Sequence, residues 1–157
     1  MSAPEVKLRQ VRPSDFKWLI KTALKREFAG VQYSWIEWPL QPIAAPVRAA
    51  AGPFVPACVI IVDGELAGYI GRSPLSGNLE YFLLNWAQGR GVGRKAISEF
   101  LAHHRAGDKA RKFVIRKKNK RSLRVLQGAL DELGWSEKSD YKIVEKPLRT
   151  VVEVGPG

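Results

Sequence analysis

The sequence predicts a mixed α/β domain in which helices flank a central sheet, and we expect this single domain to span residues 1–157. The chain has 157 residues, which is the size of one ordinary domain. Segments in which every second residue is apolar, typical of strands, are interspersed with segments whose apolar residues recur at helical spacing. The sequence contains no internal repeat and no linker-like stretch. The predicted order is therefore strand, helix, irregular segment, three strands, helix, strand, helix and two strands.

The first part of the chain begins with a strand and a helix. Residues 5–12 alternate apolar and polar side chains, and Pro13 opens a helix that we expect to reach Phe28. Residues 30–56 lack periodicity and contain five prolines. We interpret this segment as a loop over a substrate site, with a short helix within 44–51, because long irregular loops in small domains are often functional. Plain surface packing is the alternative.

The remaining elements follow from the same two periodicities. Asp63-Gly64 joins two apolar runs at 57–62 and 66–70, which is the strongest short-range signal for a hairpin. We expect the later elements to be a strand at 79–85, a helix from Val92 to about Gly107, a strand at 112–116, a helix at 119–133, and strands at 141–144 and 150–154.

Basic residues exceed acidic ones by a wide margin, 26 against 15, which gives a net charge of +11. Ten of the basic residues and one acidic residue lie between positions 105 and 124. Such a cluster favours a polyanionic partner, which could be a nucleic acid, an acidic protein surface or a phosphorylated cofactor. A solvated basic face remains the alternative.

The composition also argues against several classes of protein. Cys58 is the single cysteine and the chain has two histidines, so we expect no disulfide framework and no metal site. No apolar run approaches the length of a membrane span, and residues 1–7 do not resemble a signal peptide. We therefore expect a cytoplasmic protein that does not associate with membranes.

A glycine-rich turn, Gln88-Gly89-Arg90-Gly91-Val92-Gly93, lies between a predicted strand and a predicted helix. Glycines allow a sharp turn and a close approach of the backbone to a ligand, and the N–H groups of the following helix suit a phosphate. The lysine and hydroxyl residue of a P-loop are missing after Gly93, and an antiparallel hairpin precedes the turn. Both observations argue against a P-loop and a dinucleotide fold.

The spacing Gln88-x-x-Gly91-x-Gly93 resembles the signature of the GNAT superfamily of acyl-CoA-dependent N-acyltransferases, and the order of elements is similar. The resemblance implies a mostly antiparallel sheet with a splayed parallel pair of strands that forms the slot for acetyl-CoA. Asn119-x-x-Ser122 resembles a second family motif, although Asn119 could equally be a helix cap. The cofactor-binding residues implied are Leu83, Leu84, Asn85, Gln88, Gly89, Arg90, Gly91, Val92, Gly93, Arg94, Asn119 and Ser122.

The same resemblance implies transfer of an acetyl group to a primary amine by direct attack in a ternary complex. Many family members carry a tyrosine on the helix at 119–133 that protonates the leaving thiolate; here Leu126 or Leu130 stands at that place, and Tyr141 is a substitute candidate. Glu80 is a candidate base, because an ammonium ion has no lone pair for attack. A backbone N–H near Leu84 or Asn85 would stabilise the oxyanion.

The acceptor is a small-molecule or macromolecular amine. Trp35, Glu37 and Trp38 are candidate substrate-binding residues, since an acid between aromatic side chains suits a cationic amine. Two alternatives stay open: a nucleic-acid-associated acyltransferase or binding protein that uses the cluster at 105–124, and a catalytically inactive sensor of acyl-CoA. A homodimer is also possible.

Overall fold

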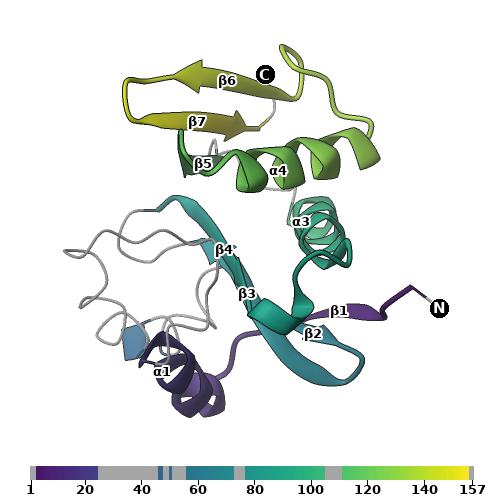
Figure 1. The fold of residues 1–157 in the computed structure, drawn as a ribbon, viewed down its shortest axis with the longest axis vertical. Helices are drawn as coiled ribbons and strands as arrows, with labels where there is room; N and C mark the ends of the chain where they lie inside the picture. The colour runs from purple at the N-terminus through teal and green to yellow at the C-terminus, as the bar shows by residue number, and fades with distance from the viewer. Residues whose placement is uncertain are drawn as a thin grey trace.

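A sheet of seven strands, in the order β1-β2-β3-β4-β5-β7-β6, forms the centre of the computed structural model (Figure 1). The structure describes residues 3–24, 46, 47, 50, 56–72, 77–104 and 111–155. The strands are β1 (Val6–Gln10), β2 (Ala57–Val62), β3 (Glu65–Arg72), β4 (Leu79–Leu83), β5 (Arg111–Arg116), β6 (Tyr141–Glu145) and β7 (Arg149–Val154). The helices are α1 (Phe16–Leu24), α3 (Val92–His103) and α4 (Lys120–Glu132), with 3₁₀ turns η1 (Pro13–Asp15) and η3 (Asn85–Ala87).

The order and type of the expected elements are confirmed, and the differences lie at their ends. The first helix begins with η1, and residues 25–28 of its expected span lie outside the described residues. The strand expected at 79–85 ends at Leu83, where the chain turns into η3. Helix α3 ends at His103, and Gly107 lies outside the described residues. Within 44–51, the described residues Pro46, Val47 and Ala50 are helical.

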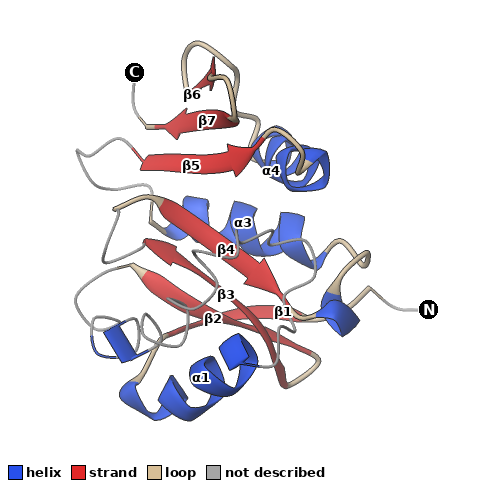
Figure 2. Ribbon diagram, turned by 60° about the vertical axis from the view of Figure 1, so that its left-hand side comes forward, coloured by secondary structure: helices blue, strands red, loops and turns tan. Residues whose placement is uncertain are grey.

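All neighbouring strands pair antiparallel except β4 and β5, which are parallel. Their ladder consists of one pair, Leu79 with Phe113, near the beginning of both strands. The two strands diverge toward their C-terminal ends (Figure 2). We call this divergence, from Leu79 to Leu83 on one side and Phe113 to Arg116 on the other, the fork. It confirms the splayed parallel pair.

The two faces of the sheet carry different helices, with α1 on one face and α3 and α4 on the other (Figures 1 and 2). Because side chains alternate along a strand, β4 contributes to both cores. Leu79 and Leu83 pack in the cluster that contains residues of α3 and α4. Phe82 and Leu84 pack in the cluster that contains Leu19 of α1. Residues 79, 81 and 83 therefore face α3 and α4, whereas residues 80, 82 and 84 face α1.

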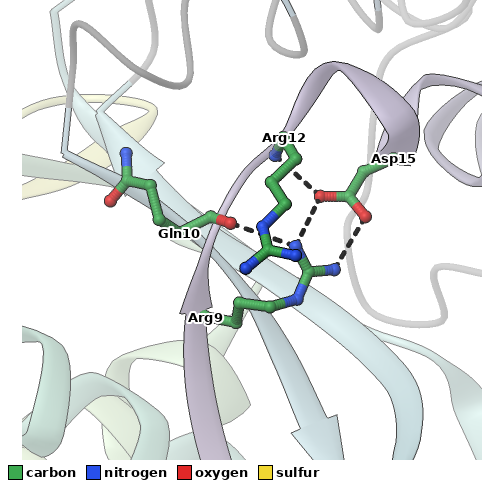
Figure 3. Close-up of polar contacts among 4 residues, drawn as sticks. All are labelled: Arg9, Gln10, Arg12 and Asp15. Carbon is green, nitrogen blue, oxygen red and sulfur yellow. Dashed lines mark hydrogen bonds and ion pairs between the residues drawn. The ribbon is translucent and has the colours of Figure 1, made fainter.

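An ion pair fixes the chain where β1 passes into η1 and α1 (Figure 3). Arg9 binds the Asp15 carboxylate with both terminal nitrogens, at 2.7 and 3.1 Å, and the backbone N–H of Arg12 donates to Asp15 Oδ2 at 2.8 Å. Burial alone would raise the pKa of the Asp15 carboxyl, but these hydrogen bonds and the charges of Arg9 and Arg12 hold the pKa below its ordinary value of 3.8. The pair thus stabilises the ionised carboxylate in the folded state.

Asp15→Asn should lower the free energy of unfolding at pH 7 by about 2 kcal/mol, because it leaves Arg9 without its buried counter-charge. The folded-state pKa of Asp15 is depressed, so the stabilisation is complete above the ordinary carboxyl pKa and is lost as the pH falls through the lowered value. Urea unfolding of both proteins should show a difference that is constant near neutrality and shrinks below about pH 4. A difference that grows on acidification would contradict this assignment.

Candidate functional site

The backbone of β4 presents hydrogen-bonding groups to the fork. Leu84 N–H donates to the Ala67 carbonyl of β3 at 2.8 Å. Since hydrogen-bonding direction alternates along an antiparallel strand, the N–H groups of Tyr81 and Leu83 point the other way, toward β5. Of the backbone N–H groups expected near Leu84 or Asn85 as oxyanion donors, that of Leu84 itself is engaged with β3 and points away from the fork. Leu83 is the strand donor that faces the fork, whereas Asn85 lies in η3 with an exposed side chain.

The glycine-rich turn connects the end of β4 to α3, beside the fork. Gly89 and Gly91 have φ angles of 76° and 77°, the left-handed region that glycine adopts without strain. Gly91 is the N-cap of α3 and has no side chain that could cap the helix. The N–H groups of the first turn of α3 have no acceptor within the helix, and they carry the positive end of its dipole. The turn can therefore bind an anionic group.

Two contacts hold this turn against the core. The Gln88 side chain donates from Nε2 to the Leu83 carbonyl at 3.0 Å, which fixes the turn to the last residue of β4. A Cβ atom on Gly93 would lie 3.2 Å from Val125 Cγ1 and 3.3 Å from Leu83 Cδ1. A glycine at this position thus lets α3 approach both α4 and β4 closely. Gln88 and Gly93 therefore hold the turn in place through contacts on its core side.

Two arginines at the turn are paired with acidic residues, and a third arginine approaches the turn from α4. Arg90 forms an ion pair with Asp63 at 3.2 Å, and Arg94 forms one with Glu132 at 2.9 Å, so both guanidinium groups already have acidic partners. Arg121, in the first turn of α4, lies beside the turn: its Nη2 is 3.9 Å from the position that a Cβ on Gly89 would take. The sequence reasoning counted Arg121 only within the basic cluster. Arg121 follows Asn119 by two residues, at the start of the helix that the second motif opens, and this position could have indicated its proximity to the turn.

The start of α4 is joined to β4 across the fork. Asn119 Oδ1 accepts a hydrogen bond from Ser122 N–H at 3.1 Å, so Asn119 caps the helix. The Tyr81 hydroxyl lies 2.7 Å from Ser122 Oγ. Burial raises the pKa of Tyr81 and outweighs the lowering effects of the Ser122 hydrogen bond and the Arg121 charge. Tyr81 therefore keeps its proton at neutral pH. Tyr81 was not among the residues expected at the site, although its alternation with Leu79 and Leu83 places it on the same face of the strand.

Glu80 lies next to Tyr81 in the chain but on the opposite face of β4, the face covered by α1. It is paired across the ladder with Gly71 of β3, and its side chain is half-buried. A carboxylate and a phenol hydroxyl therefore flank β4 from its two sides at the fork. This arrangement can accept a proton on one face and donate one on the other.

Comparison with solved structures identifies the fold. A protein assigned to the GnaT family of acetyltransferases, from Bordetella pertussis, matches with a TM-score of 0.63 and 16% identity, covering 99% of this chain and 97% of its own. The chain has the GNAT fold. Diaminobutyrate acetyltransferase EctA from Paenibacillus lautus, in complex with L-2,4-diaminobutyric acid and coenzyme A, matches with a TM-score of 0.64 and 14% identity over 98% of this chain and 96% of its own.

A third match is the microcin C7 self-immunity acetyltransferase MccE, in complex with acetyl-CoA and AMP. Its TM-score is 0.63 at 13% identity, covering 98% of this chain and 93% of its own. A scan against protein-family models and a search of curated proteins each find no match. The similarity to known proteins is therefore a similarity of fold, and this fold includes both the fork and the glycine-rich turn.

Not every residue expected at the site lies at the fork of this GNAT fold. Tyr141 begins β6 and pairs with Val154, which also pairs with Arg111 at the start of β5. Tyr141 is thus two strands away from β5. It lies at the height of Arg111, where β5 begins, whereas the fork opens toward the other end of β5. Burial and the charges of Asp131 and Glu137 raise its pKa. Trp35, Glu37 and Trp38 lie outside the described residues.

The described part of the basic cluster divides into paired and exposed residues. Lys112 pairs with Glu153 at 2.9 Å and Lys117 with Glu145 at 3.5 Å, both on the surface. The exposed basic residues at the β5–α4 turn and along α4 are Lys118, Lys120, Arg121 and Arg124. They follow directly on the strand that forms one side of the fork. The cluster therefore adds positive potential to the candidate site.

Metal-binding and membrane-spanning features are both missing from the described ranges of the chain. These ranges contain no group of three or more His, Cys, Asp or Glu side chains that could hold a metal ion. They also contain no helix long and apolar enough to cross a membrane. Cys58 is buried in β2, and burial raises the pKa of its thiol to about 11, so it is a poor nucleophile at neutral pH.

Proposed function

We propose that this protein is an N-acetyltransferase that moves the acetyl group of acetyl-CoA to a primary amine by direct attack in a ternary complex. The observation that carries the proposal is the turn at Gly89 and Gly91, which opens α3 beside Arg121 at the fork. Two of the similar solved structures are complexes with acetyl-CoA or coenzyme A, and one of them also holds its substrate, L-2,4-diaminobutyric acid. These complexes support the ligand class for this chain.

The residues of the site fit the parts of acetyl-CoA in chemical type. The diphosphate would bind the N–H groups of residues 89–94 and the guanidinium of Arg121, since both are donors with positive charge. A pantetheine amide N–H would donate to the Leu83 carbonyl of β4, which leaves the Leu83 N–H free for the thioester. Asn119 and Ser122, at the start of α4, would contact the same arm. Exposed lysines at the β5–α4 turn would suit the remaining phosphate.

The reaction needs a neutral amine and a stabilised oxyanion. Glu80 would accept the ammonium proton, either directly or through a water molecule, and so expose the lone pair for attack on the thioester carbon. The backbone N–H of Leu83, which points into the fork, would donate to the oxyanion. Collapse of the tetrahedral intermediate breaks the carbon–sulfur bond and releases the coenzyme A thiolate. No acyl-enzyme is needed, because the buried thiol of Cys58 is inert.

The decisive experiment is calorimetric titration of the purified protein with acetyl-CoA, followed by a thiol-release assay. Acceptors should include diamines, polyamines, aminoglycosides, peptides with a free N-terminus and aminoacyl-tRNA. Saturable binding and thiol release that depends on one class of amine would support the proposal. Absence of binding would overturn it. Binding without turnover on any acceptor would favour the acyl-CoA sensor.

Arg121→Glu should weaken acetyl-CoA binding by about tenfold or more, because it replaces a charge-assisted contact to phosphate by repulsion. Lys7→Glu is the matched control: it changes the net charge equally, but Lys7 lies in β1, at the far edge of the sheet, in an exposed pair with Glu5. Its affinity should stay within about twofold of the wild type. Equal losses in both variants would mean that only the overall charge of the protein matters.

A second candidate function is association with nucleic acid, which the exposed basic residues at the β5–α4 turn favour. In that case the amine acceptor would be carried on an RNA. Binding of tRNA that falls steeply with rising salt, and that acetyl-CoA does not displace, would support it. Binding that acetyl-CoA displaces would instead assign these cations to the coenzyme phosphates.

A further inference from the structure

The proposed reaction leaves one proton unassigned. When the carbon–sulfur bond breaks, the coenzyme A thiolate departs with a negative charge, and because a thiol with a pKa near that of cysteine is mostly protonated at neutral pH, the thiolate takes up a proton. A donor near the sulfur would stabilise the thiolate as it leaves the tetrahedral intermediate. The assignment of this second proton transfer rests on the proposed function.

Tyr81 is the described hydroxyl group that crosses the fork. Its side chain leaves β4 on the face of α3 and α4, between Leu79, the last residue paired with β5, and Leu83, the donor at the end of the strand. If the parallel ladder continued past Leu79, residue 81 would stand opposite Ile115. Instead the strands separate there, and the Tyr81 hydroxyl reaches Ser122 Oγ at 2.7 Å on α4. The tyrosine therefore lies along the path between the strands.

The hydrogen bonds around Tyr81 can supply a proton and replace it. In the Tyr81–Ser122 pair either oxygen can be the donor. When Ser122 Oγ donates to the Tyr81 oxygen, the phenol proton is held only by the longer contact to the Ser122 carbonyl oxygen, at 3.4 Å, and can turn to another acceptor. Ser122 is half-buried in the first turn of α4, next to the exposed residue Arg121, so its own hydroxyl can exchange protons with water. The result is a short relay from solvent to the fork.

The electrostatic surroundings keep this phenol protonated but able to donate. Burial raises the pKa of Tyr81, the Ser122 hydrogen bond lowers it, and the charge of Arg121 in α4 also lowers it. Glu80 belongs to the same strand but faces α1, so its carboxylate lies on the other side of β4. A positive charge beside the hydroxyl also favours a thiolate over a thiol in the same place.

We propose that Tyr81 is the acid of the reaction: its hydroxyl donates a proton to the sulfur of the departing coenzyme A, and Ser122 Oγ re-supplies the phenol oxygen. As the carbon–sulfur bond breaks, its electron pair remains on sulfur and takes up the phenol proton. The phenolate then recovers a proton through Ser122 from water. Glu80 releases the amine proton to solvent on the α1 side. The two proton transfers thus occur on opposite faces of β4 and do not compete.

The test measures the ionisation of coenzyme A bound to the protein, which needs no acceptor amine. The ultraviolet absorbance of the thiolate is recorded against pH for saturated complexes with the wild type, Tyr81→Phe and Tyr141→Phe. A hydroxyl donor beside the sulfur stabilises the thiolate, so the wild type should show a thiolate fraction about tenfold above that of Tyr81→Phe near neutral pH. Tyr141→Phe should match the wild type, because Tyr141 lies away from the fork.

The outcomes separate this inference from the proposed function. Equal thiolate fractions in the wild type and Tyr81→Phe, with equal acetyl-CoA affinity, would overturn the role of Tyr81 and leave the acetyltransferase intact. A lower thiolate fraction in Tyr141→Phe, with an unchanged fraction in Tyr81→Phe, would assign the role of the acid to Tyr141. Failure of the wild type to bind acetyl-CoA would remove both.

A second variant guards against a purely structural effect of the Tyr81 substitution. Ser122→Ala keeps the phenol and removes its partner. It should slow proton exchange at the phenol and lower the single-turnover rate of thiol release, measured at saturating acetyl-CoA so that a change in coenzyme affinity does not affect the rate. An unchanged rate in Ser122→Ala would exclude the relay.

Discussion

Gly68→Ala should lower the free energy of unfolding by about 3 kcal/mol, the upper end of the usual cost of overpacking. A Cβ on Gly68 would lie 2.2 Å from the Phe82 carbonyl oxygen and 2.9 Å from Leu83 Cδ2. The Phe82 carbonyl oxygen belongs to the backbone and cannot move aside as the end of a flexible side chain can. The added Cβ would therefore push β3 and β4 apart beside Leu83, which borders the fork. The small gain from a less flexible unfolded chain does not offset this. Urea denaturation gives the difference directly.

Gly128→Ala is the matched control for this substitution. Gly128 lies in α4, and the three atoms nearest to the place that an added Cβ would take all belong to the Arg94 side chain, the first of them Cδ at 2.9 Å. Arg94 can move, and alanine favours a helix over glycine by about 1 kcal/mol. We expect this variant to be as stable as the wild type or more so. Similar losses in both glycine variants would refute the argument from the close approach of β3 and β4.

Glu80→Gln should lower the rate of acetyl transfer by about a hundredfold or more at neutral pH, the usual contribution of a general base. The amide keeps the size of the side chain but cannot take the ammonium proton. Acetyl-CoA affinity should stay within about twofold, because Glu80 faces α1 and the residues proposed to bind the coenzyme lie at the fork and the turn. Stopped-flow thiol release with the best acceptor, combined with calorimetry, separates the two effects.

The control for Glu80→Gln is the same substitution at Glu65, an exposed residue at the beginning of β3. Glu65→Gln removes one negative charge without touching the fork, so its rate should equal that of the wild type. If raising the pH restores the rate of Glu80→Gln to the wild-type value, the lost function is removal of the ammonium proton. A Glu80→Gln protein with full activity at neutral pH would show that another group, or water alone, accepts that proton.

The glycine-rich turn and the order of elements were predictable from the sequence because their causes are local. A left-handed φ at Gly89 and Gly91 requires glycine, and the helix that follows has its own apolar periodicity. Asp63-Gly64 likewise specified the hairpin of β2 and β3. Asn119 was recognisable as a cap from its residue type and its place before a helical pattern.

The direction of individual groups at the site was decided by tertiary structure. The register of β3 on β4 directs the Leu84 N–H away from the fork and the Leu83 N–H into it, and nothing within the strand sequence distinguishes these two neighbours. Arg90 and Arg94 find acidic partners on other elements, whereas Arg121 approaches the turn from α4. Charge counting along the chain treats these arginines as equivalent.

What the sequence by itself determined is the GNAT fold and the place of its glycine-rich turn, since both depend on periodicity and on glycine conformations within short segments. What only the tertiary structure decided is which side chains meet there. Tyr81 and Ser122 are 41 residues apart and belong to a strand and a helix that meet only across the fork. Their contact depends on how far β4 and β5 diverge, which is set by packing over the whole sheet and not by any local pattern.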